Sequence, residues 1–133
     1  MSRNMTIVSI AAYLDAQHHT AATTVTGDAV DTFNLYEGHP ARYAVMLCTG
    51  TVADGSVSIR LEHSDDGSTW ETAKMQSGAD ASVELNANTP RRHSNALGVK
   101  RYIRLVAVVN EGTETTDVTF SATVSLDMGA LSL

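Results

Sequence analysis

The side chains best suited to bind a metal ion are five histidines and one pair of neighbouring aspartates. The histidines are His18, His19, His39, His63 and His93. They lack the i, i+4 spacing of a helical zinc site, and no carboxylate set stands beside them. Asp65 and Asp66 could offer oxygens to calcium, but the ligand spacing of a helix-loop-helix calcium site is missing. The sequence therefore predicts no metal and no cofactor, and these aspartates are expected to bond turn amides.

Nucleophilic catalysis has no recognisable constellation in this sequence. Cys48 is the single cysteine, lies in an apolar run and is predicted to be a small buried hydrophobe, so no disulfide forms within the chain. There is no glycine-flanked nucleophile elbow, no phosphate-binding glycine loop and no dinucleotide fingerprint. We therefore expect a protein that is not an enzyme.

The sequence SDDGSTW, residues 64–70, has the composition of a hairpin turn and ends in the single tryptophan. Before it, apolar and polar residues alternate over residues 56–63 with the period of a half-buried strand. Gly67 after Asp66 provides the positive φ that a tight turn requires, because glycine has no Cβ. The residues predicted to define this hairpin are Asp65, Asp66, Gly67 and Trp70.

Trp70 has two interpretations at this stage. Its ring could cover one end of the core, with the indole N–H bonded near the edge. Alternatively, it could be exposed as a stacking platform for a sugar. Covering the core is the interpretation that we favour.

The rest of the chain is a series of short strand patterns separated by turn signals. About eight strands without a convincing long helix predict an all-β, single-domain antiparallel β-sandwich or jelly roll. The strand over residues 42–49, RYAVMLCT, has apolar groups on both faces and is predicted to be central. The strands over residues 99–109 and 118–126 are predicted to pair as a hairpin. Residues 87–97, ANTPRRHSNAL, have no pattern and are predicted to be a loop.

The two ends of the chain show no clear strand pattern. Residues 1–20 are predicted to be an N-terminal arm, extended or a short helix, before a β-sandwich domain over residues 21–133 with a short C-terminal tail. The apolar side chains of residues 1–20 are expected to be covered by the body of the domain or, as we favour, by a neighbouring subunit, and those of the tail by another chain. The terminal residues predicted to lie in such an interface are Ile7, Val8, Ile10, Tyr13, Leu14, Leu131 and Leu133.

The charge of the chain argues against nucleic acid as a direct partner. Nine basic and fifteen acidic residues give a formal charge of −6, the wrong sign for a phosphate backbone. Five of the cations nevertheless fall within residues 91–104. Such a cluster is usually a solvated face. The alternative interpretation is a basic patch, including Arg91 and Arg92, that docks on an acidic protein surface.

No segment predicts a membrane partner. No apolar run approaches the roughly 18 residues that a spanning helix needs. The apolar opening over residues 5–14 is a poor secretory signal, so synthesis in the cytoplasm is expected.

Two resemblances extend this interpretation. SDDGSTW resembles a hairpin of several sugar-binding β-sandwiches and is one residue short of the aspartate box. The segments RYAVMLCTG, SVSIRLEHSDDGSTWETA, ALGVKRYIRLVAVV and DVTFSATVSL, within residues 41–126, resemble a group of small tailed-phage virion proteins often encoded beside the major capsid protein. This resemblance implies a capsid decoration, or cement, protein on the outside of the shell that commonly assembles as trimers. The two ends of the chain match nothing in this pattern.

The resemblance implies a non-enzymatic virion protein on the outer capsid surface, made in the bacterial cytoplasm. Its partners would be the major capsid protein and further copies of itself. It would stabilise the assembled head by bridging capsomers, through Arg91, Arg92 and the two ends of the chain. Two alternatives are a carbohydrate- or receptor-binding module of a phage tail or fibre, and a tail or head-to-tail connector subunit.

Overall fold

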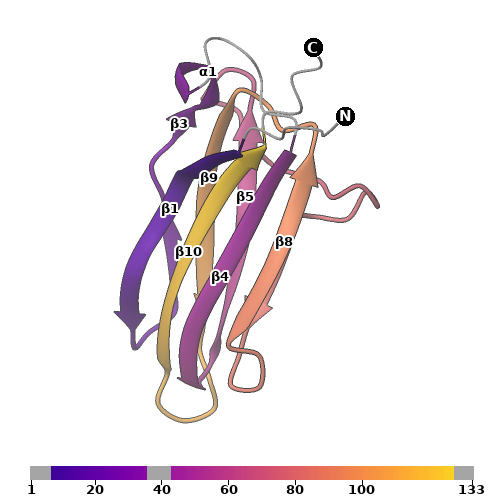
Figure 1. The fold of residues 1–133 in the computed structure, drawn as a ribbon. Helices are drawn as coiled ribbons and strands as arrows, with labels where there is room; N and C mark the ends of the chain where they lie inside the picture. Colours follow the sequence, from indigo (N-terminus) through magenta and orange to yellow (C-terminus); the bar gives the residue numbers. More distant parts are fainter. Residues whose placement is uncertain (1–6, 36–42, 128–133) are drawn as a thin grey trace.

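Two antiparallel sheets lie face to face in the computed structural model, which describes residues 7–35 and 43–127 (Figure 1). The predicted all-β sandwich is therefore confirmed. It has ten strands rather than about eight, together with the four-residue helix α1 (Thr32–Leu35).

The smaller sheet, sheet A, has four strands in the order β1-β10-β4-β8. Their bounds are β1 (Ile7–His19), β10 (Asp117–Asp127), β4 (Tyr43–Asp54) and β8 (Arg91–Leu97). The larger sheet, sheet B, has the order β2-β9-β5-β6, with β3 beside β9 and β7 beside β5. Its strands are β2 (Thr23–Thr26), β3 (Val30–Asp31), β5 (Ser56–Ser64), β6 (Glu71–Thr72), β7 (Ser82–Leu85) and β9 (Tyr102–Asn110).

The core lies between the sheets and is built from alternate residues of the long strands. Sheet A contributes Met46 and Phe120, and sheet B contributes Ile59 and Leu105, all fully buried. Cys48 is also buried, and this burial raises the pKa of its thiol to about 12. The thiol therefore stays protonated near neutral pH and acts as a small apolar group.

Residues 7–19 are extended, one of the two predicted conformations, but they form β1 at the edge of sheet A and are not an arm outside the domain. This strand pairs with β10 along its length, but its register shifts between Val8 and Ala12 and again between Leu14 and Gln17. The first shift inserts two extra residues and keeps the alternation of faces, whereas the second inserts one and reverses which face a side chain takes. The period of two is broken for this reason, so the sequence pattern did not show a strand.

The predicted loop over residues 87–97 is also wrong, because residues 91–97 form the edge strand β8. Its backbone pairs with β4 without interruption from Tyr43 opposite Leu97 to Thr49 opposite Arg91. Only the small side chains of Ser94 and Ala96 point into the core. Backbone pairing therefore holds this strand in place, and that interaction has no hydrophobic signature in the sequence.

The strands β9 and β10 do not form the predicted hairpin. β9 lies in sheet B between β2 and β5, whereas β10 lies in sheet A between β1 and β4. Residues 111–116 connect one sheet to the other at the lower end of the view in Figure 1. Alternating polarity shows that a strand has one buried face, but it does not distinguish a hairpin from a crossover between sheets.

β4 lies inside sheet A, as predicted, but its two apolar faces have different surroundings. Ala44, Met46 and Cys48 point into the core. Val45 and Leu47 alternate with them and point outward, where they are partly exposed. The second apolar face of this strand is therefore part of the molecular surface.

Candidate functional site

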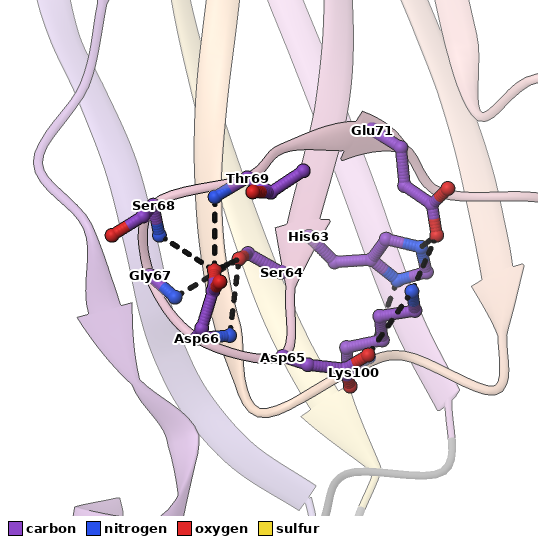
Figure 2. Close-up of polar contacts among 9 residues, drawn as sticks. All are labelled: His63, Ser64, Asp65, Asp66, Gly67, Ser68, Thr69, Glu71 and Lys100. Carbon is purple, nitrogen blue, oxygen red and sulfur yellow. Dashed lines mark hydrogen bonds and ion pairs between the residues drawn. The ribbon is translucent and has the colours of Figure 1, made fainter.

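The turn between β5 and β6 is held by two side chains, as Figure 2 shows. The Ser64 hydroxyl donates to Asp66 Oδ1 at 2.9 Å and accepts the Gly67 amide at 2.9 Å. The same Asp66 oxygen accepts the amides of Ser68 at 2.8 Å and Thr69 at 2.9 Å. Gly67 has a φ of 78°, a conformation that residues with a Cβ rarely adopt.

These bonds stabilise the charged form of the Asp66 carboxyl group. The amides of Thr69 and Ser68, followed by the Ser64 hydroxyl, lower the pKa of Asp66 to about 2. The folded-state pKa is thus below the unfolded value of about 3.9. The contribution of Asp66 to stability is therefore fully present above the unfolded pKa and is lost as the pH falls towards 2.

We expect Asp66→Asn to destabilise the protein at pH 7 and to matter much less near pH 2, where the wild-type carboxyl group is also largely protonated. Urea unfolding of both proteins at each pH measures this difference. Asp65→Asn is the matched control, because Asp65 accepts no backbone amide among the described residues. If Asp66→Asn lowered the free energy of unfolding by the same amount at both pH values, the stabilising role of the charged Asp66 carboxylate would be contradicted.

A pocket of about 200 Å³ lies beside this turn. It is lined by Asp65, Asp66, Thr69, Trp70, Glu71 and Lys100. Lys100 Nζ lies 2.7 Å from Glu71 Oε1 and 3.3 Å from Asp65 Oδ2, so one cation is shared by two carboxylates. The lining residues offer hydrogen-bonding groups and one aromatic residue, Trp70, but no activated nucleophile.

His63 lies next to this ion cluster and is almost fully buried. Its Nδ1 accepts the Lys100 amide at 3.2 Å, so the neutral ring carries its proton on Nε2, which lies 3.3 Å from Glu71 Oε1. Burial lowers the pKa of His63, although the Glu71 carboxylate opposes this effect. In its neutral form, the His63 side chain therefore links β5, through this hydrogen bond, to the segment that precedes β9.

Trp70 does not close the core, so that prediction is wrong. It is partly exposed, lies outside the core cluster, and its ring centroid is 4.2 Å from the Arg104 guanidinium carbon. The register of the hairpin explains this position. Thr72 lies opposite Glu62, which points away from the core, and Trp70 shares the face of Thr72.

Glu62 is the centre of a polar cluster on this outer face of sheet B. Its two carboxylate oxygens accept hydrogen bonds from Arg60 and Arg104, each at 2.8 Å. Burial alone would raise the pKa of Glu62, but the two arginines lower it overall. Trp70 packs over this cluster through Arg104, which explains its position by packing alone.

The exposed large apolar side chains among the described residues all lie on sheet A. They are Tyr13 (59% exposed), Val45 (38%), Leu47 (36%) and Leu97 (39%), and each alternates with buried neighbours. All four therefore point outward from sheet A, on the surface that we call the outer face. Such a group of exposed apolar side chains is typical of a protein interaction surface.

The centre of the outer face carries no formal charge. The outward residues are Thr119, Ser121, Thr123 and Ser125 in the central part of β10, Tyr43, Val45, Leu47, Thr49 and Thr51 of β4, and His93, Asn95 and Leu97 of β8. The charged side chains lie at the margins: Asp117 at the start of β10, Arg91 at the start of β8, and the exposed Asp15 on the edge strand β1. The two central strands thus form an uncharged surface between charged margins.

Arg91 and Arg92 are exposed at the start of β8. Neither forms an ion pair with a carboxylate in the part of the chain that the structure describes. The other three cations of the 91–104 cluster are paired instead: Lys100 with Asp65 and Glu71, Arg101 with Asp31, and Arg104 with Glu62. The predicted basic patch is thus reduced to two arginines at the border of the outer face.

The other predicted interface residues have different positions. Tyr13 is on the outer face, but Leu14 is buried in the core of its own chain and cannot cover a neighbour. That part of the prediction is wrong, because Leu14 points inward next to the outward Tyr13. The backbone of β1 includes Ile7, Val8 and Ile10, whose side chains lie outside the described part, as do Leu131 and Leu133.

The sequence pattern did not predict the exposed positions of Val45, Leu47 and Leu97 on the outer face, or the pairing of Glu71 with Lys100 in the pocket. The apolar residues on both faces of the strand over residues 42–49 were a signal for the first group. Nothing local pairs Lys100 with Glu71, because this contact depends on the positions of two strands.

Within residues 7–35 and 43–127, no group of three or more histidine, cysteine, aspartate or glutamate side chains is placed to hold a metal ion. In the same residues, no helix has the length and hydropathy needed to cross a membrane.

Comparison with known proteins identifies the fold. No protein-family model and no curated protein matches the sequence. Among solved structures, the PBSX exported protein XepA is similar with a TM-score of 0.54 and 17% identity, over 90% of this chain and 38% of XepA. The SPBc2 prophage-derived protein YomS has a TM-score of 0.41 and 17% identity over 89% of this chain and 98% of its own. PirA has a TM-score of 0.49 and 14% identity over 82% of this chain and 92% of its own. The chain thus shares the β-sandwich fold of one part of XepA, and it spans well under half of that protein's length.

Proposed function

We propose that this chain is a non-enzymatic structural protein of a phage virion that decorates the outer surface of the assembled head. The observation that carries the proposal is the distribution of surface chemistry. Exposed apolar side chains gather on the outer face of sheet A, and at its border lie two arginines that have no ion-pair partner among the described residues. This surface suits contact with other proteins rather than turnover of a substrate. The fold likeness to the phage-related XepA supports a phage setting.

The proposed mechanism is preferential binding to the intact shell. A protein that contacts neighbouring capsomers at once binds the assembled head better than its separate subunits, and therefore shifts the equilibrium towards assembly. Arg91 and Arg92 would supply the polar contacts, facing carboxylates of the major capsid protein. Because the net charge of the chain is −6, these two positive charges also favour an approach in which this end of the chain faces the acidic groups of the shell.

The composition of purified particles tests this location. We expect quantitative mass spectrometry to find many copies per particle, in a fixed ratio to the major capsid protein, and immunogold label on the head. A few copies per particle with label at the neck would instead identify a connector subunit. Absence from the particles would contradict a structural role.

The pocket beside the hairpin favours carbohydrate binding as a second candidate. Its volume of about 200 Å³ suits one sugar ring, and Asp65, Thr69 and Lys100 could bond hydroxyl groups next to the edge of Trp70. On this account, Trp70→Ala abolishes binding to a glycan array without unfolding the protein. If no glycan binds the wild type, this candidate is excluded.

A further inference from the structure

We propose that the outer face of sheet A packs against the same face of a second copy of this chain. The pair would be related by a two-fold axis that runs along the strands between β10 and β4. This inference deepens the proposed function, because it names a partner for the interaction surface, but the pairing itself needs no capsid.

The charge of the chain favours a second copy as the occupant. Two chains that each carry −6 repel one another through most of their surface. Between Thr119 and Ser125 of β10, and between Tyr43 and Thr51 of β4, the outer face has no formal charge; Asp15, Asp117 and Arg91 lie at its margins. The central strands of two copies can therefore meet without placing carboxylates together.

The size of the face is sufficient for a specific pair. Sheet A has four strands, of 13, 11, 12 and 7 residues. With strands about 4.8 Å apart and a rise of about 3.3 Å per residue, the face covers about 700 Å². This is close to the ~800 Å² that each partner buries in a standard protein interface.

The arrangement of large and small side chains sets the orientation. The outward residues of β10 from Thr119 to Ser125 are all serine or threonine, whereas neighbouring β4 presents Val45 and Leu47. A two-fold axis along the strands places β10 of each copy over β4 of the other. The small side chains of one copy then lie against the large side chains of its partner, twice in the same interface.

This geometry has a consequence for binding to the head. Because the axis runs along the strands, the arginine pairs Arg91-Arg92 of both copies emerge at the same end of the assembly. The pair would present two basic contacts to one shell surface, so the second contact forms at a high effective concentration. A two-fold pair is therefore preferred here to the trimer that the resemblance implies.

Sedimentation velocity of the full chain, without capsid, tests the pairing over a wide concentration range. We expect the wild type to have the mass of two chains, and Leu47→Lys to have the mass of one, with the dissociation constant raised at least 100-fold. Thr24→Lys is the matched control, because it adds the same charge at an exposed position on β2 of sheet B and should leave the pair intact. Circular dichroism and the melting temperature show whether each variant is folded.

Thr123→Tyr tests the small-on-large arrangement. This substitution adds apolar surface at the centre of the outer face, so unspecific apolar association would become stronger. The proposed packing predicts at least tenfold weaker pairing, because the tyrosine fills the space that Val45 or Leu47 of the other copy needs.

A single-chain mass for the wild type would overturn the proposal, and so would a trimer or a pair that Leu47→Lys leaves unchanged. The proposed function fails in a different way. A single chain that still binds heads would refute only the pairing, whereas a pair that ignores heads would refute only the decoration role.

Discussion

Replacing Phe120 with alanine is expected to lower the free energy of unfolding by about 3–5 kcal/mol, as for other large buried aromatic residues. Phe120 of β10 is 1% exposed, and the His19 ring of β1 stacks on it with centroids 5.7 Å apart. Across the sheet it lies opposite Gly50 of β4, where an added Cβ would overlap the Thr119 carbonyl oxygen. The strands approach too closely here for the cavity to close by a small shift.

Trp70→Ala is the control for this prediction, because it removes an even larger aromatic side chain from outside the core. We expect a loss of about 1 kcal/mol, from the contact with Arg104 and partial burial. Urea denaturation at neutral pH measures both variants. If Trp70→Ala were as destabilising as Phe120→Ala, the position of Trp70 outside the core would be contradicted.

Reversing both charges in Arg91→Glu/Arg92→Glu is expected to weaken binding to intact heads about 100-fold, which corresponds to about 2.7 kcal/mol. These two arginines are exposed at the start of β8, and each reversal replaces attraction to the shell by repulsion. Stability should change little, because both side chains are exposed and form no ion pair among the described residues. Binding of fluorescently labelled protein to purified heads gives the affinity.

The matched control is Arg91→Lys/Arg92→Lys, which keeps both charges. It should retain most of the affinity, with a moderate loss if the arginines bind carboxylates in bidentate fashion. Wild-type binding should also weaken as salt is raised from 50 to about 300 mM, because exposed charges are screened. Equal affinity of the wild type and the double glutamate variant would exclude these arginines from the contact with the shell.

The sequence predicted the parts of the fold that depend on local alternation. β5 and the turn that follows it were recognisable because Ser64, Asp66 and Gly67 bond within a few residues of one another. β1 was hidden by its two register shifts, and β8 by the lack of large apolar residues at its inward positions. The separation of β9 and β10 into different sheets depends on topology, which alternation does not determine.

The same limit applies to the candidate sites. The position of Trp70 depends on the register that sets Thr72 opposite Glu62, and the sequence alone does not fix this register. The outer face had a visible signal, since the strand over residues 42–49 is apolar on both faces. That signal has two explanations, a strand buried on both faces or a strand with one exposed interaction face, and the exposure of Val45 and Leu47 selects the second.

Co-sedimentation of the purified chain with intact heads, and in parallel with dissociated major capsid protein, tests the decoration role most directly. We expect saturable binding to intact heads at a fixed ratio to the capsid subunits, with much weaker binding to the free subunits. Equal binding to both forms, or no binding to intact heads, would contradict it.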